Sequence, residues 1–76
     1  MPDEQPRWII DARKAVGDRI RVRRLHQNMT QESLAHTTGL DRSTIQRMEA
    51  GQEMKLSHLL LVAHELRVHV TDLLHG

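Results

Sequence analysis

Cysteine, phenylalanine and tyrosine are absent from this 76-residue chain, and tryptophan occurs once. Without cysteine, neither a disulfide framework nor a thiolate metal site can form. Alternating apolar and polar positions are also missing, so there is no signal for β-strands. The longest apolar run, residues 59–63, is too short to cross a membrane, and the first residues lack the apolar centre of a signal peptide. These absences predict an all-α, cytoplasmic protein without membrane contact.

Charge is unevenly distributed along the chain, although its formal net value is only +1. Residues 12–47 carry eight basic and three acidic side chains, whereas residues 48–76 carry two basic and four acidic ones. This asymmetry is typical of a domain with one face toward phosphate groups and another turned away. For the arginine-rich run alone, a solvated basic helix is the alternative explanation. The length predicts one domain over residues 12–76, preceded by an N-terminal extension over residues 1–11.

Residues 30–51 contain the most informative pattern, TQESLAHTTGLDRSTIQRMEAG. Counting Gln31 as the first position, Ala35 is fifth, Gly39 ninth and Ile45 fifteenth. A helix-turn-helix needs a small residue where two helices cross, a glycine in the tight turn between them and an apolar residue facing back into the core. The pattern therefore predicts this motif. Its remaining apolar positions are filled by Leu34, Leu40 and Met48.

Apolar spacing and capping residues predict five helices, at about residues 12–27, 31–38, 42–50, 56–66 and 70–74. Thr30 and Asp41 are suited to cap the second and third helices. Ser33 and Thr44 stand where a full capping box has Glu or Gln, so we expect no box at either start. The fourth helix is expected to bury one apolar stripe, consisting of Leu56, Leu59, Leu60, Ala63 and Leu66.

The third predicted helix has a polar outward face. At about 100° per residue, its side chains turned away from Ile45 and Met48 are hydrogen-bonding groups. Arginine can bond guanine with two donors, and glutamine can bond adenine, in the major groove of DNA. The helix therefore carries candidates for base contacts, namely Arg42, Ser43, Gln46 and Arg47. The alternative is a small helical bundle whose polar face is simply solvated.

With these residues at these spacings, the chain resembles the helix-turn-helix family of lambdoid phage repressors and Cro, which is widespread among bacterial regulators and antitoxins. The resemblance covers roughly residues 14–74. It implies a compact five-helix domain whose third helix enters the major groove, commonly as a symmetric homodimer. By position, it makes Arg42, Ser43 and Arg47 base contacts and Gln31 a phosphate contact. Arg19 and Arg23 are further phosphate candidates.

Glu49 lies on the inward side of the third helix, where an unpaired carboxylate would be costly. The pattern of the family pairs this position with Arg24 on the first helix, so the resemblance implies a structural ion pair. The alternative role for Arg24 is a phosphate contact, and the two roles are compatible. Asn28 and Arg67 stand where the family often has glycine, so the helix ends there are expected to be strained or differently shaped.

Two apolar sites are candidates for contact with a second copy of the chain. Leu61 lies opposite the predicted core stripe of the fourth helix and Val62 on its flank, and an exposed apolar pair is typical of a dimer contact. Trp8, with its neighbours Ile9 and Ile10, precedes the family resemblance. Three placements of this cluster are compatible with the sequence: an extension of the first helix, packing over the domain, or burial within a dimer. We favour burial within the dimer.

Six histidines raise the question of a metal or catalytic site. His64 and Glu65 resemble the start of a zinc-protease helix, but the second histidine must follow four residues after the first, and Val68 stands there. We expect no enzyme activity, metal or cofactor. The predicted function is a transcriptional regulator that binds an inverted repeat in double-stranded DNA as a homodimer. The alternative is an antitoxin or adaptor that binds another protein through Leu61, Val62 and Trp8.

Overall fold

The computed structural model describes residues 5–76, and five helices and no strand are found in this range. They are α1 (Arg7–His26), α2 (Gln31–Thr38), α3 (Arg42–Glu49), α4 (Leu56–Glu65) and α5 (Val70–Leu74). The predicted all-α, five-helix fold is confirmed. Residues 1–4 of the predicted N-terminal extension lie outside the described residues. None of the described helices combines the length and the apolar character needed to cross a membrane.

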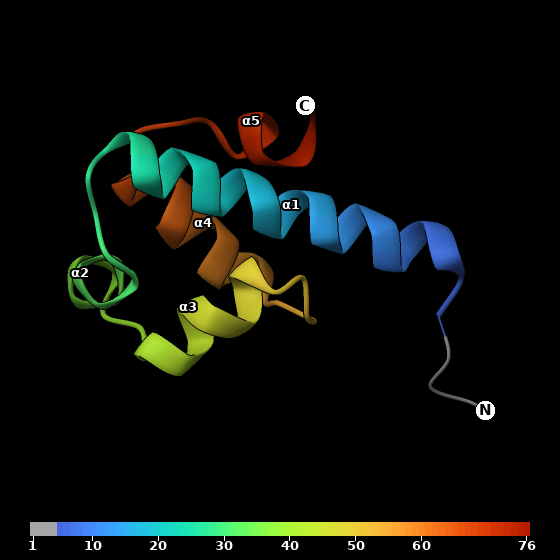
Figure 1. The fold of residues 1–76 in the computed structure, drawn as a ribbon, viewed down its shortest axis with the longest axis horizontal. Helices are drawn as coiled ribbons and strands as arrows, with labels where there is room; N and C mark the ends of the chain where they lie inside the picture. The colour runs from blue at the N-terminus through green and yellow to red at the C-terminus, as the bar shows by residue number, and fades with distance from the viewer. Residues whose placement is uncertain (1–4) are drawn as a thin grey trace.

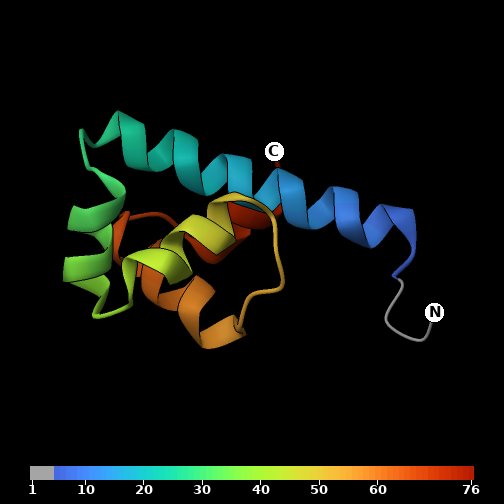
Figure 2. The same ribbon diagram turned by 60° about the horizontal axis from the view of Figure 1, so that its bottom comes forward.

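Helix α1 is the longest element and runs along one edge of the molecule (Figure 2). It packs against α3 and α5, which lie below and above it in the view of Figure 1 and contact different parts of its surface. Helix α2 packs against α3 and α4, and α4 also packs against α5. The N-terminal turns of α1 extend beyond the other helices (Figure 1). The two ends of α1 therefore have different surroundings.

The core lies between α1 and the other four helices and is aliphatic. All five helices contribute to it, as their inward-facing apolar periodicity requires. Its buried apolar residues are Val16, Ile20, Leu34, Ala35, Ile45, Met48, Leu59, Val62, Ala63, Leu66 and Leu73. Core contacts of this kind fix the orientation of α3 against α1 and α2, because interiors are close-packed and leave helices little freedom to shift.

Gly17 allows α1 and the end of α3 to approach each other closely. A Cβ atom at this position would lie 2.5 Å from the carbonyl oxygen of Met48 and 2.7 Å from that of Glu49. Backbone atoms at the end of a packed helix cannot easily move away, so only glycine fits without a shift of one helix. This contact brings α1 directly against the C-terminal end of α3.

Residues with left-handed backbone follow the ends of α1, α2, α3 and α4. Gly39 has φ 75°, as its position between α2 and α3 predicts. Asn28 and Arg67 have φ 56° and 59°, so both helix ends adopt the conformation that glycine would favour there. Thr30 and Ser33 form a reciprocal capping box at the start of α2, with bonds of 3.0 and 2.9 Å. The expectation of no box there is wrong, because the serine hydroxyl accepts the bond that Glu or Gln would accept.

The beginning of α1 differs from the prediction. The helix starts at Arg7, directly after Pro6, and not near residue 12, so it runs through the predicted boundary between extension and domain. Trp8 thus extends the first helix. Its side chain is 71% exposed in the single chain.

Helix α4 also differs, because it buries a different stripe from the predicted one. Leu56 and Leu60 are exposed, whereas Val62 is fully buried among the core residues. The expectation that Val62 offers apolar surface to a partner is therefore wrong. Leu61 is 42% exposed.

Candidate nucleic-acid interface

The turn between α2 and α3 is held by short-range hydrogen bonds. The amide of Leu40 donates to the carbonyl of Ala35 at 3.1 Å, which closes the turn around Gly39. The Thr38 hydroxyl donates to the carbonyl of Leu34 at 2.8 Å and accepts from the Leu40 amide. These bonds satisfy backbone groups at the end of α2 that would otherwise lack partners. They fix the direction in which the chain enters α3.

Helix α3 begins after Asp41, whose side chain makes no capping bond. The expected side-chain cap is therefore wrong, and the carbonyl of Asp41 instead accepts from the amides of Thr44 and Ile45 at 3.0 and 3.2 Å. A carboxylate near the start of a helix still interacts favourably with the positive end of the helix dipole.

The two faces of α3 are chemically distinct. Ile45, Met48 and Glu49 are buried. The four predicted base-contacting residues, Arg42, Ser43, Gln46 and Arg47, are all exposed. Arg47 makes a long contact of 3.4 Å to the hydroxyl of Thr44, so its guanidinium lies along the helix surface. The structure thus brings the four side chains onto the outward side of one helix.

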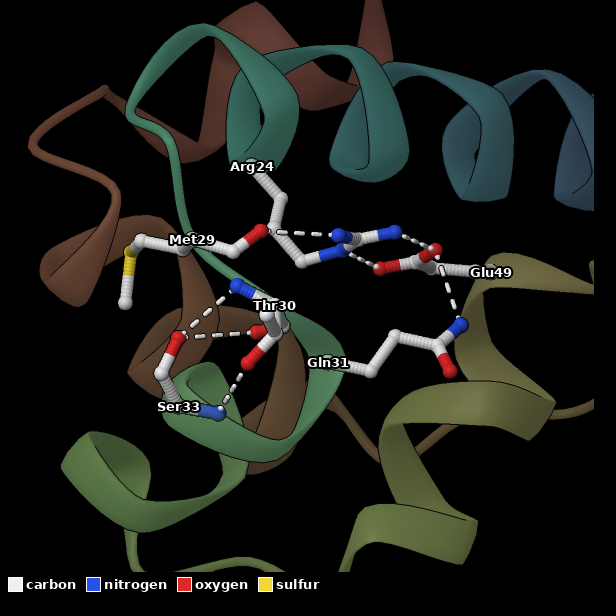
Figure 3. Close-up of polar contacts among 6 residues, drawn as sticks. All are labelled: Arg24, Met29, Thr30, Gln31, Ser33 and Glu49. Carbon is white, nitrogen blue, oxygen red and sulfur yellow. Dashed lines mark hydrogen bonds and ion pairs between the residues drawn. The ribbon is translucent and has the colours of Figure 1, made fainter.

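An ion pair between α1 and α3 joins the two helices (Figure 3). Arg24 Nε donates to Glu49 Oε2 at 2.6 Å, and Arg24 Nη2 donates to Glu49 Oε1 at 3.0 Å. A third donor, Arg24 Nη1, bonds the carbonyl of Met29 at 2.8 Å. Both residues are buried. A buried carboxylate is tolerated only when its charge and its hydrogen-bonding capacity are satisfied, and this two-pronged geometry satisfies both.

Hydrogen bonding to Glu49 raises the pKa of Arg24 above its ordinary value, against the opposing effect of burial. The guanidinium therefore stays charged at every pH below the ordinary arginine pKa. The pair joins the end of α1, the α1–α2 connection and the end of α3 into one unit. We refer to Arg24, Glu49 and Met29 as the clamp.

Gln31, the predicted phosphate contact, lies beside the clamp. Its amide Nε2 donates to Glu49 Oε1 at 3.2 Å (Figure 3). The residue is half-buried at the first position of α2, where it is next to the exposed start of the motif.

Arg19 and Arg23 lie elsewhere. Arg19 Nη1 donates to the carbonyl of Leu73 in α5 at 3.1 Å. Arg19 and Arg23 both line a hollow that Asp72 and His75 line from the C-terminal end of the chain. None of the residues that line this hollow belongs to α2 or α3, so these two arginines lie apart from the outward side of α3. The structure therefore does not support them as phosphate contacts of the same interface.

Two residues that the sequence did not single out lie beside α3. Lys55 and His58 line a hollow of about 110 Å³ together with Arg47 and Thr44. Glu53 lines it as well. Lys55 directly precedes the first residue of α4. Its basic side chain, one loop after the motif, is the sequence feature that could have identified it as a candidate. Lys55 thus places a positive charge, and Glu53 a negative charge, on the flank of α3.

The comparisons with known proteins agree with this geometry. The family model HTH_3, described as Helix-turn-helix, matches residues 20–73. A comparison with curated protein sequences gave no match.

Three solved structures are similar over most of their length. The restriction-modification controller protein C.AhdI from Aeromonas hydrophila has a TM-score of 0.76 and 36% identity, over 83% of this chain and 96% of its own. The clp gene regulator ClgR from Corynebacterium glutamicum has a TM-score of 0.78 and 28% identity, over 83% of this chain and 68% of its own. The hypothetical transcription factor NHTF from Neisseria has a TM-score of 0.82 and 30% identity, over 100% of this chain and 87% of its own.

The family match covers more than half of the chain and includes the whole α2–turn–α3 segment. The residues that it spans also include Arg24 and Glu49, which form the ion pair beneath α3. The chain belongs to the helix-turn-helix family of DNA-binding transcription regulators of the Cro and phage-repressor type, a family of regulators and not of enzymes.

Proposed function

We propose that this regulator reads a specific DNA sequence by inserting α3 into the major groove, and that it binds an inverted repeat as a homodimer. The observation that supports this most directly is the division of α3 into a buried side and an exposed side of four hydrogen-bonding residues. A major groove admits one α-helix, and base edges there are read by side chains of these types.

The residues have separate roles in this proposal. Arg42 and Arg47 contact guanine, with Gln46 and Ser43 as supporting base contacts. Gln31 contacts phosphate from the start of α2 and is oriented by its bond to Glu49. Lys55 and His58, on the flank of α3, replace Arg19 and Arg23 as the further phosphate candidates. Phosphate contacts position the helix but carry no direct sequence information.

A homodimer with two-fold symmetry would present its two α3 helices to half-sites about 34 Å apart, one turn of DNA. Two exposed apolar side chains on different helices support self-association, Leu61 on α4 and Trp8 on α1.

The proposal is tested by selecting bound duplexes from a random DNA library at physiological salt. The wild-type chain is compared with the double variant Arg42→Ala/Arg47→Ala. The matched control is Arg23→Ala, which removes an exposed arginine that is not on the outward side of α3. We expect an inverted repeat to be enriched by the wild type and by the control, and lost in the double variant.

On the selected operator, Arg47→Ala is expected to cost about 1–3 kcal/mol of binding and to relax the preference at one base pair. Lys55→Ala should instead weaken all sequences alike and flatten the dependence of affinity on salt. A wild-type chain that enriches no sequence would overturn the proposal.

An antitoxin or adaptor role is the second candidate. Its support is the set of large apolar side chains that remain exposed, above all Trp8 and Leu56 at 71% and 67%. In this case the main partner is another protein, and the library selection fails while the chain remains folded.

A further inference from the structure

We propose that Trp8 docks against a hollow at the N-terminal end of α1 in a second copy of the chain, so that two copies cover each other's hollow around a two-fold axis. The inference rests on the homodimer in the proposed function and names the surface that joins it. It concerns residues 7–19 of α1, which precede the residues matched by the family model.

The hollow has a volume of about 390 Å³ and lies between α1, the loop before α4 and the end of α5. Its walls are mainly apolar and include Ala12, Ala15, Leu59 and Leu74. The small side chains of Ala12 and Ala15 leave space along the surface of α1. An open apolar hollow of this size is a place where apolar side chains of a partner are removed from water.

Trp8 contributes to the lining of this hollow, and most of its side chain also projects into solvent beside it. It lines the hollow and yet is 71% exposed. The turn that carries it is part of the segment of α1 that extends beyond the other helices (Figure 1). A projecting side chain next to a hollow on one surface is self-complementary, because a two-fold axis brings each projection onto the hollow of the other copy. Tryptophan contributes large buried area at such contacts.

The charges around the hollow also favour a second copy. Arg13, Arg19 and Glu53 line the hollow, and the mostly exposed carboxylate of Glu53 lies 3.5 Å from Arg13. Arg7 and Asp11 flank Trp8 on the same helix and form an exposed ion pair of 3.3 Å. When the turn with Trp8 enters the hollow of the other copy, Arg7 can approach the second copy's Glu53, and Asp11 can approach its Arg19. Opposite charges around an apolar centre select the partner and its orientation.

The contact leaves the DNA-reading side of α3 free. None of the four proposed base-contacting residues lines the hollow. The two functions therefore use separate surfaces of the same small domain.

The first test uses the intact chain without DNA and its single tryptophan. We expect the fluorescence maximum of Trp8 to shift to shorter wavelength as protein concentration rises. The shift should follow the increase in mass measured by sedimentation equilibrium. A mass increase without a change in Trp8 emission would overturn the inference and would leave the proposed DNA-reading dimer intact, joined through another face.

The second test fills the hollow with charge. Ala12→Glu is exposed on α1 and keeps good helix propensity, so the fold should be retained, as circular dichroism can verify. We expect it to weaken self-association at least tenfold. The matched control is Leu25→Glu, an exposed apolar site near the other end of α1 and outside the hollow, which should leave association unchanged.

The two proposals can fail separately. If Ala12→Glu loses association and the wild type selects no DNA sequence, this contact is supported and the DNA-reading function is overturned. Equal association of Ala12→Glu and wild type would overturn the contact, whatever DNA is bound. A wild-type chain that stays monomeric at concentrations of about 100 µM, where weak specific contacts are populated, would also overturn it.

Discussion

The two ends of α1 differ in which kind of side chain they bury. Near its C-terminal end a charged residue, Arg24, is buried at 7% exposure, whereas near its N-terminal end the only aromatic residue, Trp8, is exposed at 71%. The usual preferences of arginine for the surface and of tryptophan for the interior are reversed. The hydrogen-bonding and packing partners that the fold offers each side chain decide whether it is buried. Glu49 and the Met29 carbonyl satisfy Arg24, and the single chain offers Trp8 only one wall of an open hollow.

The largest expected effect comes from breaking the clamp at the C-terminal end. Arg24→Met leaves Glu49 as an uncompensated buried charge, which should lower the free energy of unfolding by about 3–5 kcal/mol. Urea unfolding followed by circular dichroism measures it. The double variant Arg24→Met/Glu49→Leu should recover most of the loss, because the unpaired charge is gone. A single variant that loses less than about 1 kcal/mol would show that the clamp is not needed for folding.

The close contact of α1 with α3 can be tested at Gly17. Gly17→Ala places a Cβ against the carbonyl oxygens of Met48 and Glu49, and overpacking of this kind should cost about 1–3 kcal/mol. Gly39→Ala is the comparison, because a Cβ there meets no atom within 4 Å but the residue has φ 75°. Its cost should be about 1–2 kcal/mol and purely conformational. A crystal structure of Gly17→Ala should show α3 displaced, and an unmoved α3 would contradict the argument.

The junction after α1 can be tested through its capping residues. Thr30→Ala removes an oxygen that accepts from the Ser33 amide and should lower the stability by about 1 kcal/mol. Asp41→Ala removes no capping bond at the start of α3 and should cost less. Thermal unfolding of both variants under one buffer condition gives the comparison. The opposite order of costs would refute the assignment of the two caps.

The smallest effect on folding is expected at the N-terminal end. Trp8→Ala should change the stability of the single chain by no more than about 0.5 kcal/mol, since the side chain is mostly exposed. Urea unfolding at low protein concentration measures this change, and a small value would separate the role of Trp8 in association from any role in folding. A large loss in the monomer would show that the end of α1 is held as firmly as the clamp.

The sequence predicted the helix-turn-helix well because each of its positions has one physical requirement. The bounds of α2 and α5 match the prediction, and α3 ends one residue earlier than expected. Gly39 adopts the left-handed conformation that its turn needs. The exposed side of α3 followed from helical periodicity alone, whereas the partner of Glu49 came from the family resemblance.

Other parts could not be derived from the pattern. In α4, apolar residues occupy most of the circumference, so periodicity does not select the buried stripe. The prediction therefore puts Val62 on the flank and Leu60 in the stripe, whereas Val62 is buried and Leu60 exposed. The start of α1 was set too late because the apolar cluster around Trp8 was treated as an extension, although Pro6 marks a helix start. The sequence offers Arg19 as a phosphate candidate, and only the fold shows that it bonds the carbonyl of Leu73 in α5.

The ion pair between Arg24 and Glu49 connects positions 25 residues apart in the chain. An opening motion that released α3 alone would have to expose two buried charges and undo the packing at Gly17, so α3 has no low-energy route to local unfolding. The hydrogen-bonded amides of α3 from Ile45 onward should then exchange with solvent only through unfolding of the whole domain. The helix proposed to read DNA is consequently presented to its target as a rigid surface, already ordered before any encounter.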